Sequence, residues 1–324
     1  MLRTMDMSIA FNNLTSVAVL VFVLGFIGAI FKSDLRIPDS IYQLISIYLL
    51  LGIGLKGGQA LKGVSFAEVI KPSLTTLVVG LIVPFLAYYL LQGVKSLTVS
   101  QRGAMAAHYG STSLVTFSAA VLYLENNSIF FEGYSTALLT IMEVPGLVVG
   151  IYLASRKYKA NVSWGKTFQE ILLGKTVLLL VGGLLVGLLT TNTGFDKVSP
   201  FFIDLLNGFL VLFLLQLGYL AGSQIGEVKK SGYGLIFFSI VFPILAGFIG
   251  AVGGYLSGMS YGGTALLAVL AGSASYIAAP AAVSIALPKE KLGLALTCSI
   301  GITFPFNLIL GIPIYLAMAN FLVN

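Results

Sequence analysis

The sequence predicts an all-α membrane protein of ten transmembrane helices, built as a 5+5 inverted repeat in which spans 4 and 9 are broken and cross. Three observations predict this fold class. Of the 324 residues, 57% are hydrophobic and 9% are charged, whereas soluble domains have about 25% charged residues. The apolar runs approach the roughly 20 residues that cross a bilayer as a helix. Two of these runs, at 106–121 and 268–283, carry Gly- and Ser-rich interruptions, which are typical of a transporter's binding site.

Polar or Gly- and Pro-containing segments separate the apolar runs and set the expected helix boundaries. The expected spans are 8–31, 37–55, 69–93, 100–124, 133–154, 172–191, 202–222, 232–256, 260–287 and 292–321. An even number of spans places both termini on one side of the membrane. The first run lacks a signal-peptide cleavage pattern, so we expect it to be retained.

The basic residues predict the orientation. Thirteen of the 18 Lys and Arg residues, including Arg156, Lys157 and Lys159, fall in loops opposite the termini. Cytoplasmic loops are enriched in Lys and Arg, so we expect both termini outside and the segment 155–171 in the cytoplasm. Topology thereby accounts for the net charge of +6, and no nucleic-acid partner is expected.

The two halves of the chain repeat the same features in the same order. Gly54–Gly58 corresponds to Gly218–Gly222, Pro84 to Pro243, Gly110 with Ser113 to Gly272 with Ser275, and Pro145 to Pro305. Five spans in each half make the second copy enter from the opposite side. We therefore expect a first repeat at 1–154, a linker at 155–171 and a second repeat at 172–324. The linker is either a connection with a short interfacial helix or a docking surface for a cytosolic regulator.

The two interruptions predict a site for a small anion. A helix that begins in the middle of the membrane directs free N–H groups and the positive end of its dipole into the site. The candidate substrate-binding residues are Gly110, Ser111, Thr112, Ser113, Gly272, Ser273, Ala274, Ser275 and Tyr276. The alternative is that these small residues only allow close helix packing.

Glu143 predicts a cation site, because a carboxylate deep in a membrane span is costly and usually functional. The oxygen ligands expected for Na⁺ are Glu143, Thr116, Ser113 and Thr303, the last being the counterpart of Glu143 in the second repeat. Two alternatives remain open for Glu143: proton coupling, or a protonated carboxyl in a helix interface. His108, the only histidine, is either a pH or anion contact or a structural hydrogen-bonding group.

No enzyme is indicated. One His and one Cys cannot form a zinc cluster, and no phosphate-binding G-x-x-x-x-G-K-[ST] loop is present. We expect no cofactor, with Na⁺ as a coupling ion.

At these residues the chain resembles the SbtA-type sodium-dependent bicarbonate transporters of cyanobacteria and their bacterial relatives. The similarity runs from Ile37 to the last span, with specific matches at Gly54–Gly58, Gly110 with Ser113 and Thr116, Tyr134–Pro145 and Ser273–Pro280. It implies the fold of sodium/bile-acid symporters, in the inner membrane of a bacterium. It also implies a gate domain (8–55 plus 172–222), a core domain (69–154 plus 232–321), a homotrimer, elevator-like transport and a possible PII-like cytosolic regulator.

The chain departs from the cyanobacterial pattern at the second interruption. That pattern has Asp in place of Tyr276, Ser in place of Ala274 and Ala278, and Asp in place of Glu143. Cation coupling is therefore expected to carry over better than bicarbonate specificity. The sequence favours Na⁺-coupled symport of bicarbonate or a similarly small anion. A Na⁺/H⁺ antiporter using Glu143 and a non-transporting anion sensor signalling through 155–171 are the alternatives.

Overall fold

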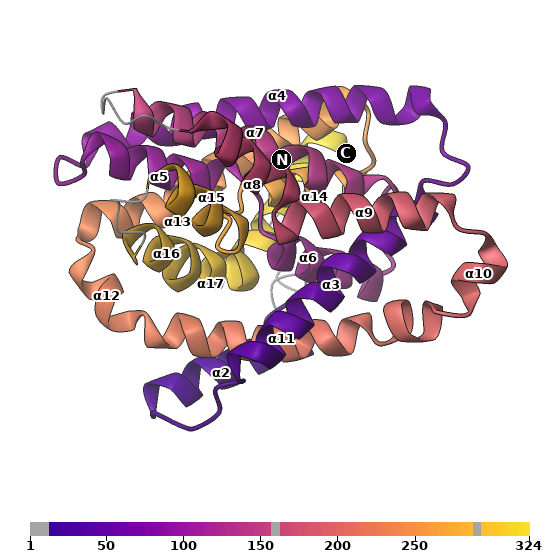
Figure 1. The fold of residues 1–324 in the computed structure, drawn as a ribbon, viewed down its shortest axis with the longest axis horizontal. Coiled ribbons are helices and arrows are strands. Elements are labelled where there is room, and N and C mark those ends of the chain that lie inside the picture. Colours follow the sequence, from indigo (N-terminus) through magenta and orange to yellow (C-terminus); the bar gives the residue numbers. More distant parts are fainter. Residues whose placement is uncertain (1–12, 157–162, 288–292) are drawn as a thin grey trace.

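The computed structural model describes residues 13–156, 163–287 and 293–324, and within these ranges every regular element is a helix (Figure 1). The first half contains α2 (Val17–Ile30), α3 (Asp39–Ala60), α4 (Phe66–Leu90), the 3₁₀ turn η1 (Leu91–Gly93), α5 (Val99–Gly110), α6 (Leu114–Asn126) and α7 (Ser135–Ser155).

The second half begins with α8 (Trp164–Leu173), α9 (Lys175–Leu189), α10 (Asn192–Asp196), η2 (Pro200–Asp204), α11 (Leu206–Ser223) and α12 (Ile225–Lys230). It continues with α13 (Tyr233–Ser257), α14 (Tyr261–Ala271), α15 (Ala278–Ala286), α16 (Gly293–Cys298), η3 (Ser299–Thr303), α17 (Phe304–Phe306), η4 (Asn307–Gly311) and α18 (Ile312–Val323). The elements η2, η3 and η4 are π-helical turns, and from α16 to α18 the helix is continuous.

Several of these helices can cross a membrane, which makes the chain a multi-pass membrane protein. Among the described residues, six have the necessary length and hydropathy: Asp39–Ala60, Phe66–Gly93, Ser135–Ser155, Pro200–Ser223, Tyr233–Ser257 and Gly293–Val323. The pair α8 and α9, bent by 49°, supplies a seventh if it counts as one span. The two expected spans that contain interruptions are each divided into two shorter helices, α5 with α6 and α14 with α15.

Four helices, α2, α3, α9 and α11, form one group, the four-helix unit. In it α2 packs on α11, and α3 packs on both α9 and α11. The α3–α9 contact is a seam of glycines, where a Cβ on Gly58 would lie 2.1 Å from the Leu184 carbonyl oxygen. Likewise, a Cβ on Gly218 would lie 2.0 Å from the Phe22 oxygen. Small residues let helix backbones approach closely in a membrane.

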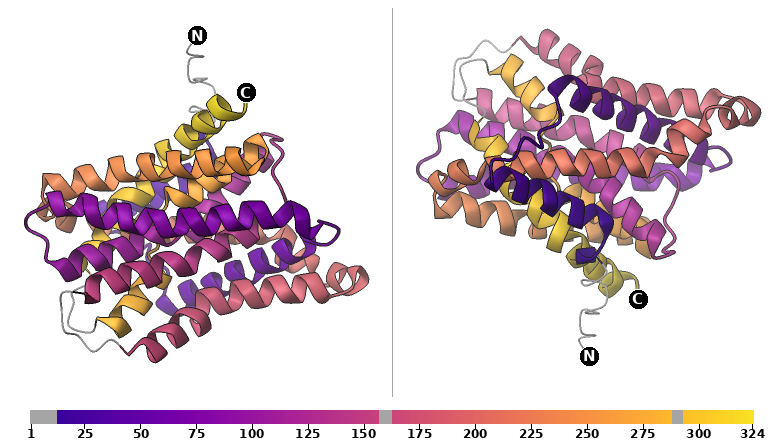
Figure 2. Two further views of the ribbon diagram at one scale, coloured as in Figure 1. Left: turned by 90° about the horizontal axis from the view of Figure 1, so that it is seen from above. Right: turned by 90° about the horizontal axis from the view of Figure 1, so that it is seen from below.

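A second group, α4 to α7 and α13 to α18, is called the broken-helix unit. Helices α4 and α13, from different halves of the sequence, run side by side along the length of the molecule (Figure 2). In Figure 1, α4 lies along one edge and α2 and α11 lie along the opposite edge. The interruptions at 111–113 and 272–276 are buried inside the molecule, and α6 and α7 contact the four-helix unit.

The predicted linker contains α8. Ile171 of this helix is 2% exposed and belongs to an apolar cluster with Ala279 and Val283 of α15. The helix thus connects α9 of the four-helix unit to α15, the helix that follows the second interruption. Residues 157–162 of the predicted linker lie outside the described ranges.

Candidate functional site

The first interruption is a three-residue break between α5 and α6. Ser111 adopts an extended backbone (φ −98°, ψ 164°), and so does Ser113 (φ −108°, ψ 109°). Ser113 is the N-cap of α6, because its hydroxyl oxygen accepts the amide of Thr116 at 3.2 Å. Serine is among the preferred N-cap residues. The new helix therefore begins inside the protein, at residues that are at most 5% exposed.

A seam of small residues holds this break against α7. A Cβ on Gly103 would lie 2.3 Å from the Ala154 Cβ, and a Cβ on Gly150 would lie 2.2 Å from the Ala107 nitrogen. At the end of α5 the contact involves two glycines, since a Cβ on Gly146 would lie 1.9 Å from the Gly110 oxygen. The seam places the break about one helical turn from Glu143.

Glu143 is bonded to the break. It is 2% exposed, and one carboxylate oxygen accepts a hydrogen bond from the Thr112 hydroxyl. None of the ion pairs among the described residues involves Glu143. Burial of an unpaired carboxylate is unfavourable unless it is protonated or meets a cation. The site thus has the chemistry to bind either a proton or a hard cation such as Na⁺.

Two more hydroxyls lie next to Thr112. The Thr116 hydroxyl donates to the Ser113 hydroxyl at 2.9 Å, and the Ser113 hydroxyl donates to that of Tyr276 at 3.2 Å. The Ser111 hydroxyl is buried, lies beside the Glu143 carboxylate and makes no well-formed hydrogen bond within the described part of the chain. Buried polar atoms are normally satisfied, so Ser111 is a further polar group of this site.

The second interruption lies against the first. The Ser273 hydroxyl accepts the Ser113 amide at 2.9 Å and donates to the Leu270 carbonyl at 2.9 Å. The Ser275 hydroxyl accepts the Ala279 amide at 3.2 Å, in the first turn of α15. Ala274 is 3% exposed and contributes no side-chain polar group. The two interruptions, about half the chain apart in sequence, therefore form one connected site.

Gly110 and Gly272 each pack closely against a neighbouring helix. A Cβ on Gly110 would lie 2.5 Å from the Pro84 Cβ, and a Cβ on Gly272 would lie 2.4 Å from the Tyr315 hydroxyl oxygen and 2.8 Å from the Pro243 carbonyl oxygen. The Gly272 carbonyl also accepts hydrogen bonds from Asn307 at 2.8 Å and Tyr315 at 3.3 Å. Asn307 thereby satisfies the end of α14.

A small cavity joins these groups. It is lined by Thr112, Ser113, Leu114, Leu139, Glu143, Thr176, Leu180, Ser275, Tyr276 and Ile277. The space that the centre of a water molecule can occupy in it is about 10 Å³. That is room for about one water molecule. The sequence prediction missed Thr176 and Leu180, which belong to α9 of the four-helix unit. The sequence feature that could have indicated this side of the cavity is Thr176, a hydroxyl residue in the first turn of an otherwise apolar run.

Thr303 lies in different surroundings from Glu143. Its hydroxyl is bonded to the Tyr109 hydroxyl at 2.8 Å and donates to the Ser239 carbonyl at 2.7 Å. The residue is fully buried in η3, and it is not among those that line the cavity. The structure thus brings Glu143, Thr112, Ser113 and Thr116 together and leaves Thr303 outside this cluster.

The fold and the site define a multi-pass helical membrane protein whose polar groups gather at two interrupted helices, an arrangement typical of secondary transporters. A family model described as the Na⁺-dependent bicarbonate transporter superfamily matches residues 17–320. The chain belongs to this superfamily, and the resemblance to SbtA-type transporters is confirmed. Comparison with curated proteins gives no match. Family membership implies Na⁺-dependent transport of an anion across a membrane, and it favours transport over catalysis.

Proposed function

We propose that the chain is a Na⁺-coupled symporter of bicarbonate or a similarly small anion. One observation carries the proposal: both interruptions and Glu143 line one buried cavity that α9 closes. An anion and a cation that share such a cavity stabilise each other in a low dielectric. Binding of the two ions is therefore coupled without any direct chemical step.

The anion half of the site is assigned to the helix ends. The amides at the start of α6 and α15 point toward the interruptions, and helix N-termini attract negative charge. The hydroxyls of Ser111 and Ser275 supply further donors, and those of Ser113 and Ser273 become donors when they release Tyr276 and Leu270. Since the cavity holds about one water molecule, a bicarbonate ion enters only when α9 or Tyr276 moves away.

The cation half is assigned to Glu143 with Thr112, Ser113 and Thr116. Carboxylate and hydroxyl oxygens are suitable ligands for Na⁺, as in the broken helices of other transporters. Bound Na⁺ neutralises Glu143, which otherwise repels an anion in the same cavity. The order of events is therefore Na⁺ first and anion second.

The proposed transport movement is based on how the residues that line the cavity are distributed between the two units. Most of its lining belongs to the broken-helix unit, and only Thr176 and Leu180 belong to the four-helix unit. We assign the core domain to 69–154 plus 232–321, the gate domain to 8–55 plus 172–222, and an elevator-like displacement of core against gate. Ten spans, an inverted repeat, a homotrimer and a PII-like regulator at 155–171 complete the proposal. The contacts of Gly110 with Pro84 and of Gly272 with Pro243, each between a divided helix and a proline-containing helix, support the repeat.

The decisive experiment measures uptake of labelled bicarbonate into proteoliposomes with and without a Na⁺ gradient. We expect wild type to require Na⁺ and Glu143→Gln to lose that requirement together with most of its uptake. Glu227→Gln is the matched control, because Glu227 is exposed and its ion pair lies within one short helix. Uptake that is equal without Na⁺, or unchanged in Glu143→Gln, would refute the coupling.

The unpaired carboxylate of Glu143 supports a second candidate, Na⁺/H⁺ antiport, since one oxygen set can bind either ion in turn. Proteoliposomes loaded with a pH-sensitive dye distinguish the two functions. Proton efflux driven by Na⁺ in the absence of bicarbonate selects the antiporter. Alkalinisation that requires bicarbonate selects the symporter.

A further inference from the structure

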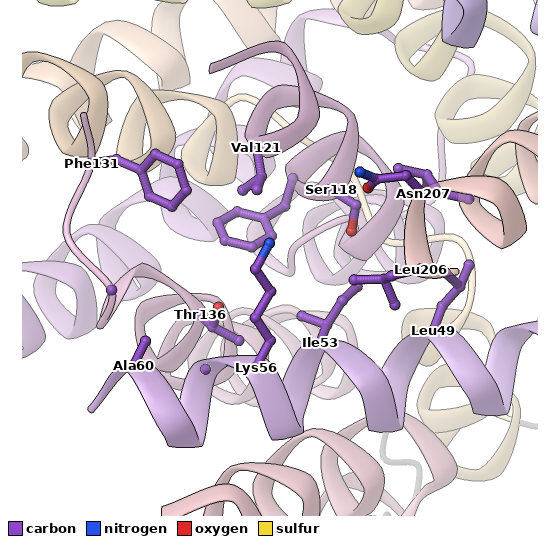
Figure 3. A pocket seen from close by; sticks show the side chains of 14 residues that line it. Leu49, Ile53, Lys56, Ala60, Ser118, Val121, Phe131, Thr136, Leu206 and Asn207 are labelled. Atoms are coloured by element: carbon purple, nitrogen blue, oxygen red, sulfur yellow. The ribbon is translucent and has the colours of Figure 1, made fainter. Parts of the chain in front are cut away.

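A second, larger cavity lies at the boundary between the two units. Its volume, on the same measure, is about 70 Å³. Its walls come from α3 and α11 on one side and from α6, α7 and the α6–α7 connection on the other (Figure 3). The walls are mostly apolar, including Ile53, Phe117 and Val121, and Lys56 is the one charged residue among the described residues that line the cavity.

Lys56 projects from α3 into this space, toward Val121 (Figure 3). Its ammonium nitrogen lies 2.6 Å from the Glu125 carboxylate, with side-chain exposures of 39% and 33%. The other two ion pairs of the described chain, Arg36–Asp39 and Lys230–Glu227, join residues three apart. Among the ion pairs of the described residues, Lys56–Glu125 is therefore the one that joins the four-helix unit to the broken-helix unit.

The larger cavity, here called the Lys56 cavity, adjoins the candidate site along two shared helices. On α6, Phe117 and Ser118 line the Lys56 cavity while Ser113 and Leu114 line the smaller one. On α7, Thr136 lines the former and Leu139 the latter. One helical turn, about 5 Å, separates the two sets. The Lys56 cavity and the candidate site therefore line successive turns of the same two helices.

We propose that the Lys56 cavity is an entry site for the transported anion, in which Lys56 binds the anion and Glu125 competes for Lys56. The inference rests on the proposed function and adds a second anion site to it. In the absence of substrate, the Glu125 carboxylate satisfies the ammonium. A small carboxylate-like anion such as bicarbonate has the same oxygens and replaces it. The exchange also breaks the one described ion pair between the units, so anion arrival and separation of the units occur together.

This mechanism predicts opposite effects for the two halves of one ion pair. Lys56→Gln removes the binding cation, so the KM for bicarbonate rises by about 3- to 10-fold. Glu125→Gln removes the competitor, so the KM falls by a similar factor of roughly 3 to 10. Lys56→Arg keeps the charge and stays near wild type. A purely structural ion pair behaves differently, since loss of either partner then changes the KM in the same direction.

The experiment measures initial rates of Na⁺-dependent bicarbonate uptake by cells that express each variant. Lys230→Gln and Glu227→Gln are the matched controls, because they break an ion pair within one helix and leave the KM unchanged. KM shifts of equal sign, or no shift, in Lys56→Gln and Glu125→Gln would overturn the inference. Absence of Na⁺-dependent uptake in wild type would instead overturn the proposed function, so the two failures are distinct.

A charge-rescue measurement keeps the inference testable if a substitution impairs folding. Lys56→Cys in a Cys298→Ala background carries its one thiol at the cavity, since Cys298 is the only native cysteine and is buried. Modification with an aminoethyl methanethiosulfonate restores a cation and should lower the KM again. A sulfonatoethyl reagent introduces an anion at the same place and should raise it. Equal effects of both reagents would contradict the proposal.

Discussion

His108 and Ser275 are joined by a reciprocal pair of hydrogen bonds across the two interruptions. The Ser275 amide donates to the His108 carbonyl at 2.7 Å, and the His108 ring nitrogen Nδ1 lies 2.7 Å from the Ser275 carbonyl oxygen. A carbonyl oxygen can only accept, so the ring carries its proton on Nδ1. These two hydrogen bonds hold the backbone of the second interruption against the end of α5.

This pairing predicts the behaviour of two His108 variants. The side-chain amide of His108→Asn places a donor where Nδ1 lies, whereas that of His108→Gln extends toward the position of Nε2. We expect His108→Asn to keep the wild-type KM for the anion and an unchanged pH profile of uptake. His108→Gln should weaken anion binding by roughly tenfold, the effect of one lost buried hydrogen bond. A wild-type KM in His108→Gln together with weakened anion binding in His108→Asn would contradict the structural role.

The contact between Gly110 and Gly146 predicts a strong effect on stability. Gly146→Ala places a Cβ 1.9 Å from the Gly110 carbonyl oxygen, so α5 and α7 must separate. Overpacking of this kind costs about 1–3 kcal/mol, and we expect a lower thermal midpoint in detergent. Gly182→Ala is the control, because a Cβ there meets nothing within 4 Å. Equal thermal midpoints for the two variants would show that α5 and α7 can accommodate the added methyl group without loss of stability.

Thr112 and Thr303 predict a contrast in Na⁺ binding. Thr112 is bonded to Glu143, whereas the Thr303 hydroxyl is occupied by Tyr109 and Ser239. Thr112→Val should raise the Na⁺ concentration for half-maximal uptake by roughly tenfold, since a ligand oxygen and a hydrogen bond are both lost. Thr303→Val should reduce stability while leaving the Na⁺ dependence unchanged. Titration of uptake against Na⁺ tests both, and a selective effect of Thr303→Val would reassign the cation site.

The predicted orientation is tested by reporter fusions. A reporter placed at Ser163, in the basic connection before α8, should be active in the cytoplasm, and one after Asn324 should be active outside. A cytoplasmic signal from the C-terminal fusion would exclude the proposed topology. In that case the Lys56 cavity would face the cytoplasm, and it would serve exit of the anion.

Much of this arrangement follows from local sequence. Gly110 followed by Ser113 predicts a broken helix with a capped restart, because glycine ends a helix and serine caps the next one. The long apolar runs around Pro84 and Pro243 predict helices that tolerate proline in a membrane. Glu143 stands out because carboxylates are rare in apolar spans.

Contacts between segments that are far apart in the chain could not be predicted from the sequence. The repeat predicted from the sequence aligns Thr303 with Glu143, but the Thr303 hydroxyl is bonded to Tyr109, and a hydrogen bond across 194 positions leaves no local pattern. Thr176 reaches the cavity because α9 packs on α3 through glycines, a contact that depends on the whole assembly. Lys56 lies within the Gly54–Gly58 motif, and only the fold brings α3 close enough to α6 to pair it with Glu125.

The amides at the start of α6 and α15 have a consequence for how this family diverges. Peptide groups are the same whatever side chain is attached, so substitutions leave this part of the site in place as long as the helices begin there. Selection for a new anion must therefore act on the few positions whose side chains complete the cavity, above all Tyr276. Relatives with different substrates should share the broken helices and differ at this position.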